Sequence, residues 1–300
     1  MTLRVDPGVR QRTLAKARVL LEALPYMREH AGRTVVLKVG GAAMAEPRLL
    51  DRFAQDVALL RMIGVRPVVV HGGGPQISAL SERLGLRPRF EGGHRVTDRE
   101  TLEVARMVLV GTLNKDLVAR INRGGVPAIG LCGEDGDLLV AERRAGPGGR
   151  DLGFVGDVTD VNDALLRELM DTAVPVLAST ATDRRGQSYN VNADLAASAV
   201  ASALDAAKLV LLTDVPGIIG DGELISELTV DDLEALTSAG SVTDGMLPKA
   251  EAVARAMRAG VGRAHIIDGR IEHAVILELF TPEGMGTMVT HPVEVPREAP

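Results

Sequence analysis

The sequence predicts an α/β fold with a mainly parallel central sheet, and two observations lead to this prediction. Apolar runs at residues 35–39 and 66–70 are continuous, as expected of strands that are buried on both faces. A helical segment at residues 47–63, closed by Gly64, lies between them. Two buried strands joined by one helix form a right-handed βαβ unit, in which the strands are parallel.

The composition of the 300 residues is that of a soluble globular protein, with 46% hydrophobic residues and a net charge of −6. No basic block is present, which argues against nonspecific nucleic-acid binding. The single cysteine, Cys132, excludes an intrachain disulfide and is interpreted as core packing. We see no signal segment and no apolar run near the ~18 residues of a membrane span, so we expect a cytoplasmic protein without a membrane partner.

Residues 1–33 form an N-terminal arm that precedes the first strand. Within it, apolar residues recur at spacings of three and four over residues 9–24, which predicts an amphipathic helix. Pro25 is expected to kink or restart that helix. The apolar stripe needs a partner, either on its own subunit or on the arm of another subunit. We favour the second alternative because the arm precedes the βαβ run as an appendage.

Each of the first two strands ends in a glycine turn. Lys38 and the pair Gly40-Gly41 end the first strand, and residues 72–74 end the second, with Pro75 in the first turn of the next helix. Both turns should lie at the carboxyl edge of the sheet, where open α/β folds bind ligands. Glycine N–H groups beside a lysine suit a polyphosphate. A lysine that extends from a strand end into solvent is the plainer alternative.

The rest of the chain continues the alternation of strands and helices. The expected elements are a loop at 92–98, a helix at 101–122, a strand at 126–131, hairpins over 133–158, a strand at 174–178, a helix ending near 204, a strand at 208–213, helices at 230–237 and 249–259, a strand at 265–269, and a helix or strand at 273–280. Because the alternation restarts near residue 205, we separate a lobe at 34–205 from a lobe at 206–300.

Asn190, Asn192 and Asp194 crowd the start of the helix that ends near residue 204. Capping explains one of these polar residues, but three in five positions indicate a further role. The sequence contains no P-loop and no dinucleotide-binding glycine motif after a predicted strand. It also lacks the clustered His and Cys residues of a transition-metal site, so we predict no protein-bound metal.

Six segments, in this order along nearly the whole chain, resemble the amino acid kinase family, and in particular its members that phosphorylate N-acetyl-L-glutamate. The segments are 36–41, 70–75, 95–97, 190–194, 212–217 and 245–249. The resemblance implies a three-layer αβα sandwich of the amino acid kinase type, in two lobes plus the N-terminal helical arm. It further implies that residues 34–205 bind the acceptor and residues 206–300 bind the nucleotide.

The resemblance implies transfer of a phosphoryl group from ATP to the side-chain carboxylate of N-acetyl-L-glutamate in arginine biosynthesis, with Mg²⁺ as the counter-ion of ATP. Such a carboxylate has a pKa near ~4.3 and is already ionised at neutral pH, so no general base is required. The obstacle is repulsion between the anionic acceptor and the γ-phosphate. Positioned cations and N–H donors can offset this repulsion.

By resemblance, Lys38 and Lys249 stabilise the transition state and Asp194 holds both lysines. Each has a plainer explanation when taken alone, such as an exposed helix lysine or a first-turn acid, but the ordered set outweighs these explanations. The residues implied for the acceptor are Gly73, Gly74, Arg95, Asn190 and Asn192. Those implied for the nucleotide are Gly40, Gly41, Thr213, Asp214, Val215 and Gly217. We expect His71 to be structural, since no proton needs to move.

The arm and the C-terminal segment resemble those of arginine-inhibited, hexameric members of the family. The resemblance implies that the arm interlaces dimers into a hexamer and that arginine is an inhibitor. The residues implied for arginine are His273, Glu278, Gly284 and Gly286. A solvated helix glutamate is the plainer alternative for Glu278. Val39 and Ala42 stand where many members carry a tyrosine and an asparagine, which affects loop detail more than activity.

Two alternatives to this function are kept. The acceptor is the longer N-acetyl-2-aminoadipate in the first, because one methylene is worth only ~1–3 kcal/mol in a pocket. In the second, the protein is a non-catalytic arginine sensor on a kinase fold. The intact set of Lys38, Lys249 and Asp194 argues against the sensor.

Overall fold

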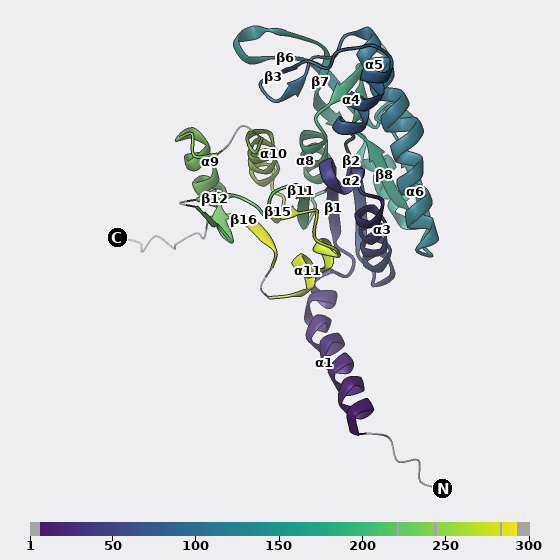
Figure 1. Cartoon of the computed structure of the whole chain (residues 1–300), viewed down its shortest axis with the longest axis vertical. Helices are drawn as coiled ribbons and strands as arrows, with labels where there is room; N and C mark the ends of the chain where they lie inside the picture. Colours follow the sequence, from purple (N-terminus) through teal and green to yellow (C-terminus); the bar gives the residue numbers. More distant parts are fainter. Residues whose placement is uncertain (1–6, 221, 243–244, 283, 293–300) are drawn as a thin grey trace.

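An eight-stranded sheet lies at the centre of the computed structural model, which describes residues 7–220, 222–242, 245–282 and 284–292 (Figure 1). In order across the sheet the strands are β14 (Glu227–Thr229), β16 (Gly286–Thr290), β15 (Arg263–Asp268), β11 (Lys208–Thr213), β1 (Thr34–Val39), β2 (Arg66–His71), β8 (Val174–Ala178) and β5 (Ala128–Leu131). Neighbouring strands are parallel except for β15 and β16. The predicted mainly parallel sheet is confirmed.

Helices cover both faces of this sheet. The α-helices of the described residues are α1 (Pro7–His30), α2 (Gly41–Ala45), α3 (Pro47–Met62), α4 (Gly74–Arg83), α5 (Arg99–Arg106), α6 (Asn114–Arg123), α7 (Asp163–Thr172), α8 (Ala193–Ala203), α9 (Val230–Ser238), α10 (Leu247–Arg258) and α11 (Ala274–Phe280). A π-helical segment, η1 (Met107–Leu113), joins α5 to α6, so the helix expected at 101–122 is continuous but is wider in its middle.

Residues of β1 alternate between two apolar cores, one on each face of the sheet. Val36 belongs to the core that includes the buried residues of α8 and α10, whereas Val35 and Leu37 belong to the core with α3 and α6. Successive side chains of a strand point to opposite faces, so Lys38 lies on the same face as Val36. The alternation therefore directs Lys38 towards α8, the helix that begins with Ala193 and Asp194.

A small closed barrel stands beside the carboxyl edge of the large sheet. It consists of β6 (Leu139–Ala145), β7 (Asp151–Val161), β9 (Thr180–Thr182) and β10 (Ser188–Val191). The antiparallel β6–β7 pair confirms the hairpin predicted within 133–158. Two shorter ribbons are β3 (Phe90–Glu91) with β4 (His94–Arg95) and β12 (Ile219–Gly220) with β13 (Glu223–Leu224). β4 contacts β7, which brings the β3–β4 ribbon to the barrel.

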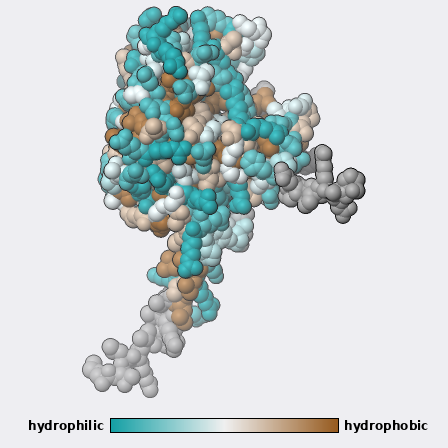
Figure 2. Space-filling view, turned by 180° about the vertical axis from the view of Figure 1, so that it is seen from behind, coloured by the Kyte–Doolittle hydropathy of each residue, from teal (hydrophilic) through white to brown (hydrophobic). Residues whose placement is uncertain are grey.

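Helix α1 extends away from the body of the molecule, and only its last turns pack against α11 (Figure 1). Its apolar residues Leu14, Val19, Leu20 and Leu21 are 51–66% exposed, and Figure 2 shows hydrophobic residues along this projecting helix. The chain therefore does not cover the apolar stripe with its own described residues. No helix in the described ranges combines the length and apolarity needed to cross a membrane.

Helix α1 runs from Pro7 to His30 with Pro25 inside it, so the helix does not restart at Pro25. Proline removes one helical hydrogen bond, but a projecting helix leaves the freed carbonyl group room to bind water. Residues 1–6 of the arm lie outside the described residues.

Candidate active site

The catalytic residues predicted from the sequence come together around Asp194. This carboxylate is in the first turn of α8 and lies 2.8 Å from Lys38 Nζ and 3.5 Å from Lys249 Nζ. The Asp194 and Lys38 side chains are only 6% and 9% exposed, and that of Lys249 is 17% exposed. One buried carboxylate therefore holds two ammonium groups that come from strand β1 and helix α10.

The charge state of Asp194 follows from these neighbours. Burial alone would raise the pKa of its carboxyl group, but the ammonium groups of Lys38 and Lys249 hold the pKa below its ordinary value. The side chain of Asn192 caps α8 by accepting hydrogen bonds from the N–H groups of Asp194 and Leu195, at 2.8 and 3.2 Å. Asp194 is thus ionised and fixed at neutral pH.

Two glycines near the site, Gly40 and Gly73, stand where any side chain would collide with a neighbour. A Cβ atom added at Gly40 would lie 2.9 Å from the ammonium nitrogen of Lys38, so any side chain there would displace the lysine. A Cβ atom at Gly73, the residue before α4, would lie 2.4 Å from Leu113. The absence of a side chain therefore lets Gly40 lie close to the Lys38 ammonium group and lets Gly73 pack against Leu113.

A hollow of about 150 Å³ lies next to this cluster. The residues expected to bind the acceptor all line it, and they are Gly73, Gly74, Arg95, Asn190 and Asn192. They come from the start of α4, the ribbon strand β4, the barrel strand β10 and the cap of α8. The sequence did not single out Phe90, Gly93 and His94, which also line the hollow. Segments far apart in sequence thus build one small polar site.

Arg95 is the cation of this hollow. Its Nη2 donates hydrogen bonds of 2.8 Å to the carbonyl oxygen of Gly74 and to Ser78 Oγ, and its guanidinium group stacks on Phe90 at 4.7 Å. Its Nη1 is buried and has no hydrogen-bond partner among the described residues. Burial lowers the pKa of Arg95 from its ordinary value, but a guanidinium group stays charged in proteins. The free Nη1 donor is available to a carboxylate ligand.

The expected nucleotide-binding residues lie where β11 ends, beside the end of β1. Lys38 pairs with Leu211, so the glycine turn at Gly40 and the loop that begins at Thr213 leave the sheet side by side. Asp214 and Val215 are exposed on this loop. A Cβ atom at Gly217 would lie 2.6 Å from Thr287 Oγ1, so this position accepts only glycine without rearrangement. This register places the loop after β11 next to the end of β1, the strand that carries Lys38.

Comparisons with known proteins decide the family. Residues 33–268 match the model of the amino acid kinase family. The chain belongs to the amino acid kinase family. It is 49% identical to the acetylglutamate kinase of Heliobacterium modesticaldum over 291 residues, which cover 93% of this chain and 99% of that protein. At this similarity over nearly full length, the protein is a kinase enzyme.

Solved structures agree with this family. The kinase superposes with a TM-score of 0.84 on N-acetylglutamate synthase from Neisseria gonorrhoeae complexed with coenzyme A and N-acetyl-glutamate, at 28% identity. The match covers 92% of this chain but only 64% of the synthase chain. The same synthase complexed with coenzyme A and L-arginine gives a TM-score of 0.79 at 26% identity.

The kinase has a second hollow, of about 400 Å³, beside the C-terminal segment. Glu278, Gly284 and Gly286 line it together with Lys208 and His265, which the sequence analysis did not predict. Burial would raise the pKa of Glu278, but the 2.6 Å hydrogen bond from His265 Nδ1 holds it below its usual range. His265 Nε2 is buried without a hydrogen-bond partner in the described chain.

His273, which the sequence analysis grouped with Glu278, does not line this hollow. Its Nδ1 lies 2.6 Å from Asp56 Oδ1 on α3, so its ring faces away from the C-terminal segment. The sequence feature that could have pointed to this hollow is a pair of polar residues, Lys208 and His265, in the otherwise apolar strands β11 and β15.

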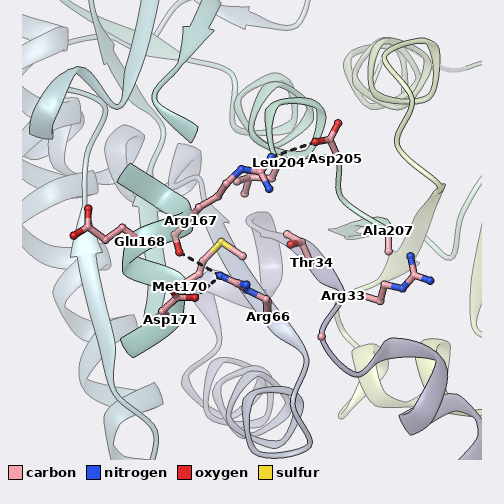
Figure 3. A pocket seen from close by; sticks show the side chains of 11 residues that line it. Arg33, Thr34, Arg66, Arg167, Glu168, Met170, Asp171, Leu204, Asp205 and Ala207 are labelled. Carbon is pink, nitrogen blue, oxygen red and sulfur yellow. Dashed lines mark hydrogen bonds and ion pairs between the residues drawn. The ribbon is translucent and has the colours of Figure 1, made fainter. Parts of the chain in front are cut away.

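A third hollow, of about 570 Å³, lies at the amino-terminal edge of the sheet, opposite the edge that carries the acceptor hollow. It is near the amino ends of β1 and β2 (Figure 3). Two of its three arginines have partners: Arg66 donates to Asp171, and Arg167 donates to Asp205 and to the carbonyl group of Ala203 near the end of α8. Cations at helix C-termini stabilise those helices. We therefore assign Arg66 and Arg167 to the stability of the fold.

His71 is predicted to make the folded kinase less stable in acid. Burial lowers the pKa of its ring from 6.5 to about 4, although the Gly72 carbonyl opposes this shift. The stabilisation is present above pH 6.5 and is lost as pH falls from 6.5 to 4, because the unfolded chain binds the proton more readily. The loss is about 3 kcal/mol in the free energy of unfolding. Urea unfolding at several pH values measures it.

The matched variant is His71→Asn, which has no titrating ring. Its free energy of unfolding should be lower at pH 7.5, because the hydrogen bond from Asn114 to His71 Nε2 is lost. It should also fall less steeply between pH 6.5 and 4. Equal slopes for both proteins would contradict the assignment of this pH dependence to His71.

Proposed function

We propose that this kinase transfers the γ-phosphoryl group of ATP to the side-chain carboxylate of N-acetyl-L-glutamate in arginine biosynthesis. The observation that carries the proposal is the pair of ammonium groups, Lys38 and Lys249, held by the buried Asp194 beside a hollow whose cation is Arg95. The name of the 49% identical relative supports the same acceptor.

The mechanism that we propose places the acceptor on residues 34–205 and the nucleotide on residues 206–300. Arg95 and the N–H groups at Gly73 and Gly74 hold the acceptor, with Asn190 and Asn192 as further polar contacts. The loop of Thr213, Asp214, Val215 and Gly217 holds ATP, and the Gly40-Gly41 turn of the acceptor segment contacts its phosphates across the two segments. The acceptor carboxylate is the nucleophile and needs no base.

Lys38 and Lys249 then offset the charge on the transferring phosphoryl group. This group passes through a transition state with charge spread over its oxygens, and cations fixed beforehand stabilise that charge without reorganisation. Asp194 serves to orient the two lysines and to keep them from repelling each other. It does not exchange a proton in this mechanism.

Mg²⁺ is proposed as the counter-ion of ATP. Within the described part of the chain, no group of three or more His, Cys, Asp and Glu residues is placed to hold a metal ion. Mg²⁺ is usually bound through substrate phosphates and water with few protein ligands. When bound, the ion would neutralise phosphate charge.

An acceptor assay tests the proposed function. ADP release is measured with ATP and either N-acetyl-L-glutamate or N-acetyl-L-2-aminoadipate. We expect turnover with the first and a kcat/KM about 10–200-fold lower with the second, the discrimination typical of one methylene. A higher kcat/KM with N-acetyl-L-2-aminoadipate would identify that compound, and not N-acetyl-L-glutamate, as the acceptor. Arginine binding without any turnover would favour the non-catalytic arginine sensor.

We also propose that arginine inhibits the enzyme from the hollow at Glu278 and that the enzyme is a hexamer built through α1. The exposed apolar stripe of α1 supports an intersubunit contact, and Tyr26 and Glu29 of α1 line the same hollow. The structural similarity to a synthase complexed with L-arginine adds support. Ionised Glu278 suits a guanidinium group.

Deleting residues 1–28 is predicted to convert the hexamer into dimers and to abolish inhibition by arginine. The deletion removes the exposed apolar stripe and Tyr26, whereas the residues proposed for catalysis all lie after it. Light scattering measures the mass, and the acceptor assay with arginine measures inhibition. Basal turnover should persist.

Glu278→Gln is the matched control for this deletion. It removes the charge that we assign to arginine binding and leaves α1 intact, so the variant should remain a hexamer while its affinity for arginine falls about tenfold or more. An unchanged mass after the deletion would contradict the role of α1. Unchanged arginine binding in Glu278→Gln would contradict the proposed effector site.

A further inference from the structure

Four charged side chains join the barrel hairpin to α10. Arg144 on β6 and Asp157 on β7 face Glu251 and Arg255 on α10. Arg144 Nη2 lies 3.2 Å from both carboxylate oxygens of Glu251, and Arg255 donates a 2.9 Å hydrogen bond to Asp157. We call these four residues the Arg144 network.

The Arg144 network is closed, because each cation contacts both carboxylates. Arg144 Nη1 is 3.3 Å from Asp157, and Arg255 Nη2 is 2.7 Å from Glu251. Arg144 is only 18% exposed, whereas the other three side chains are 31–46% exposed. An isolated exposed ion pair contributes little, but a partly shielded network of alternating charges holds its members in fixed positions more effectively.

The Arg144 network crosses between the two segments that we propose as lobes. Arg144 and Asp157 belong to residues 34–205, and Glu251 belongs to residues 206–300. Lys249 of α10 also crosses, to Asp194, whereas Arg258 pairs with Asp231 and Glu234 of α9 and does not cross. The Arg144 network therefore links α10 to the proposed acceptor lobe, residues 34–205, whereas the ion pairs between α10 and α9 do not.

Glu251 follows Lys249 by two residues on α10. An α-helix is rigid over so short a distance, so a contact that fixes Glu251 also fixes the backbone of Lys249. The start of α10 depends on other contacts for its position, because the N-cap residue Met246 makes no side-chain capping hydrogen bond in the described structure. The Lys249–Asp194 separation of 3.5 Å is also longer than the 2.8 Å of Lys38.

We propose that the Arg144 network positions Lys249 for phosphoryl transfer, with Arg144 and Glu251 as its central positioning residues. The inference rests on the proposed function, in which Lys249 acts on the transition state. A lysine whose backbone shifts loses transition-state contact more than ground-state binding. The network thus contributes to kcat although none of its members lines the acceptor hollow.

Glu251→Gln in the full chain tests this role. The variant removes the negative charge between Arg144 and Arg255, and we expect kcat to fall about tenfold while KM for ATP and for N-acetyl-L-glutamate changes less than about twofold. The matched control is Glu234→Gln, which loses an ion pair of 2.7 Å to Arg258 of the same helix. The control should keep the kcat of the unchanged protein.

A double variant and a measurement without catalysis complete the test. Arg144→Gln combined with Glu251→Gln should lose less than the product of the single losses, because both remove the same pair. Amide hydrogen exchange at residues 249–253 should accelerate in Glu251→Gln but not in Glu234→Gln. These exchange rates test the network even if the proposed acceptor fails, since no substrate is needed.

Each of the following outcomes would overturn the inference. They are an unchanged kcat in Glu251→Gln, an equal loss of kcat in Glu234→Gln, and exchange at residues 249–253 that is the same in both variants. A rise in KM with constant kcat would assign the network to substrate binding and would likewise overturn it.

Discussion

Lys38→Met is expected to lower kcat by about 10²–10³-fold, the size of effect seen when one fixed donor to a transition-state oxygen is removed. The KM values should change much less, because the ammonium group of Lys38 faces Asp194 in the protein and acts on charge that develops only during transfer. Steady-state kinetics with N-acetyl-L-glutamate and ATP measure both constants. A kcat within threefold of the unchanged protein would exclude Lys38 from the reaction.

Lys38→Met also removes a partner from a buried carboxylate. Breaking a buried pair typically lowers the free energy of unfolding by about 3–5 kcal/mol. Here we expect a loss of about 3 kcal/mol, because Lys249 stays beside Asp194. The double variant Lys38→Met, Asp194→Asn removes the unpaired charge and should regain most of the stability. It should not regain activity. Recovery of both together would mean that Lys38 serves folding alone.

The sequence predicted the fold well wherever a local pattern determines the structure. The continuous apolar runs that became β1 and β2 are buried on both faces, and a glycine turn follows each. The period of two along β1 even determines the face of Lys38. Helix periodicity did not reveal η1, because apolar spacing over residues 107–113 is compatible with either helix type.

The barrel and the second hollow depended on contacts between distant segments. No local pattern pairs β10 with β7, more than 30 residues earlier in the chain, and the acceptor hollow depends on that pairing. His273 was grouped with Glu278 because the C-terminal segment resembles that of arginine-inhibited members of the family, whereas β15 places His265 against Glu278. The resemblance did not reveal that His273 precedes α11 in a left-handed conformation and turns towards α3.

Arg95→Ala is expected to raise KM for N-acetyl-L-glutamate by about 10²–10³-fold, because hydrogen bonds from a charged donor are worth roughly 1.5–3 kcal/mol each. KM for ATP should stay within about threefold. The structure explains why this arginine should matter: Nη2 is held by Gly74 and Ser78, so Nη1 is oriented before any ligand arrives. Acceptor titrations at saturating ATP measure the effect.

Two further variants separate the charge of Arg95 from its geometry. Arg95→Lys keeps the positive charge but loses the planar fork, so KM for the acceptor should still rise about tenfold. Ser78→Ala removes one of the two supports of Nη2 and should raise KM only a few-fold, since the carbonyl of Gly74 still accepts its hydrogen bond. A lysine variant with unchanged KM would show that a point charge suffices, and Arg95 would then attract the acceptor without orienting its carboxylate towards the two lysines.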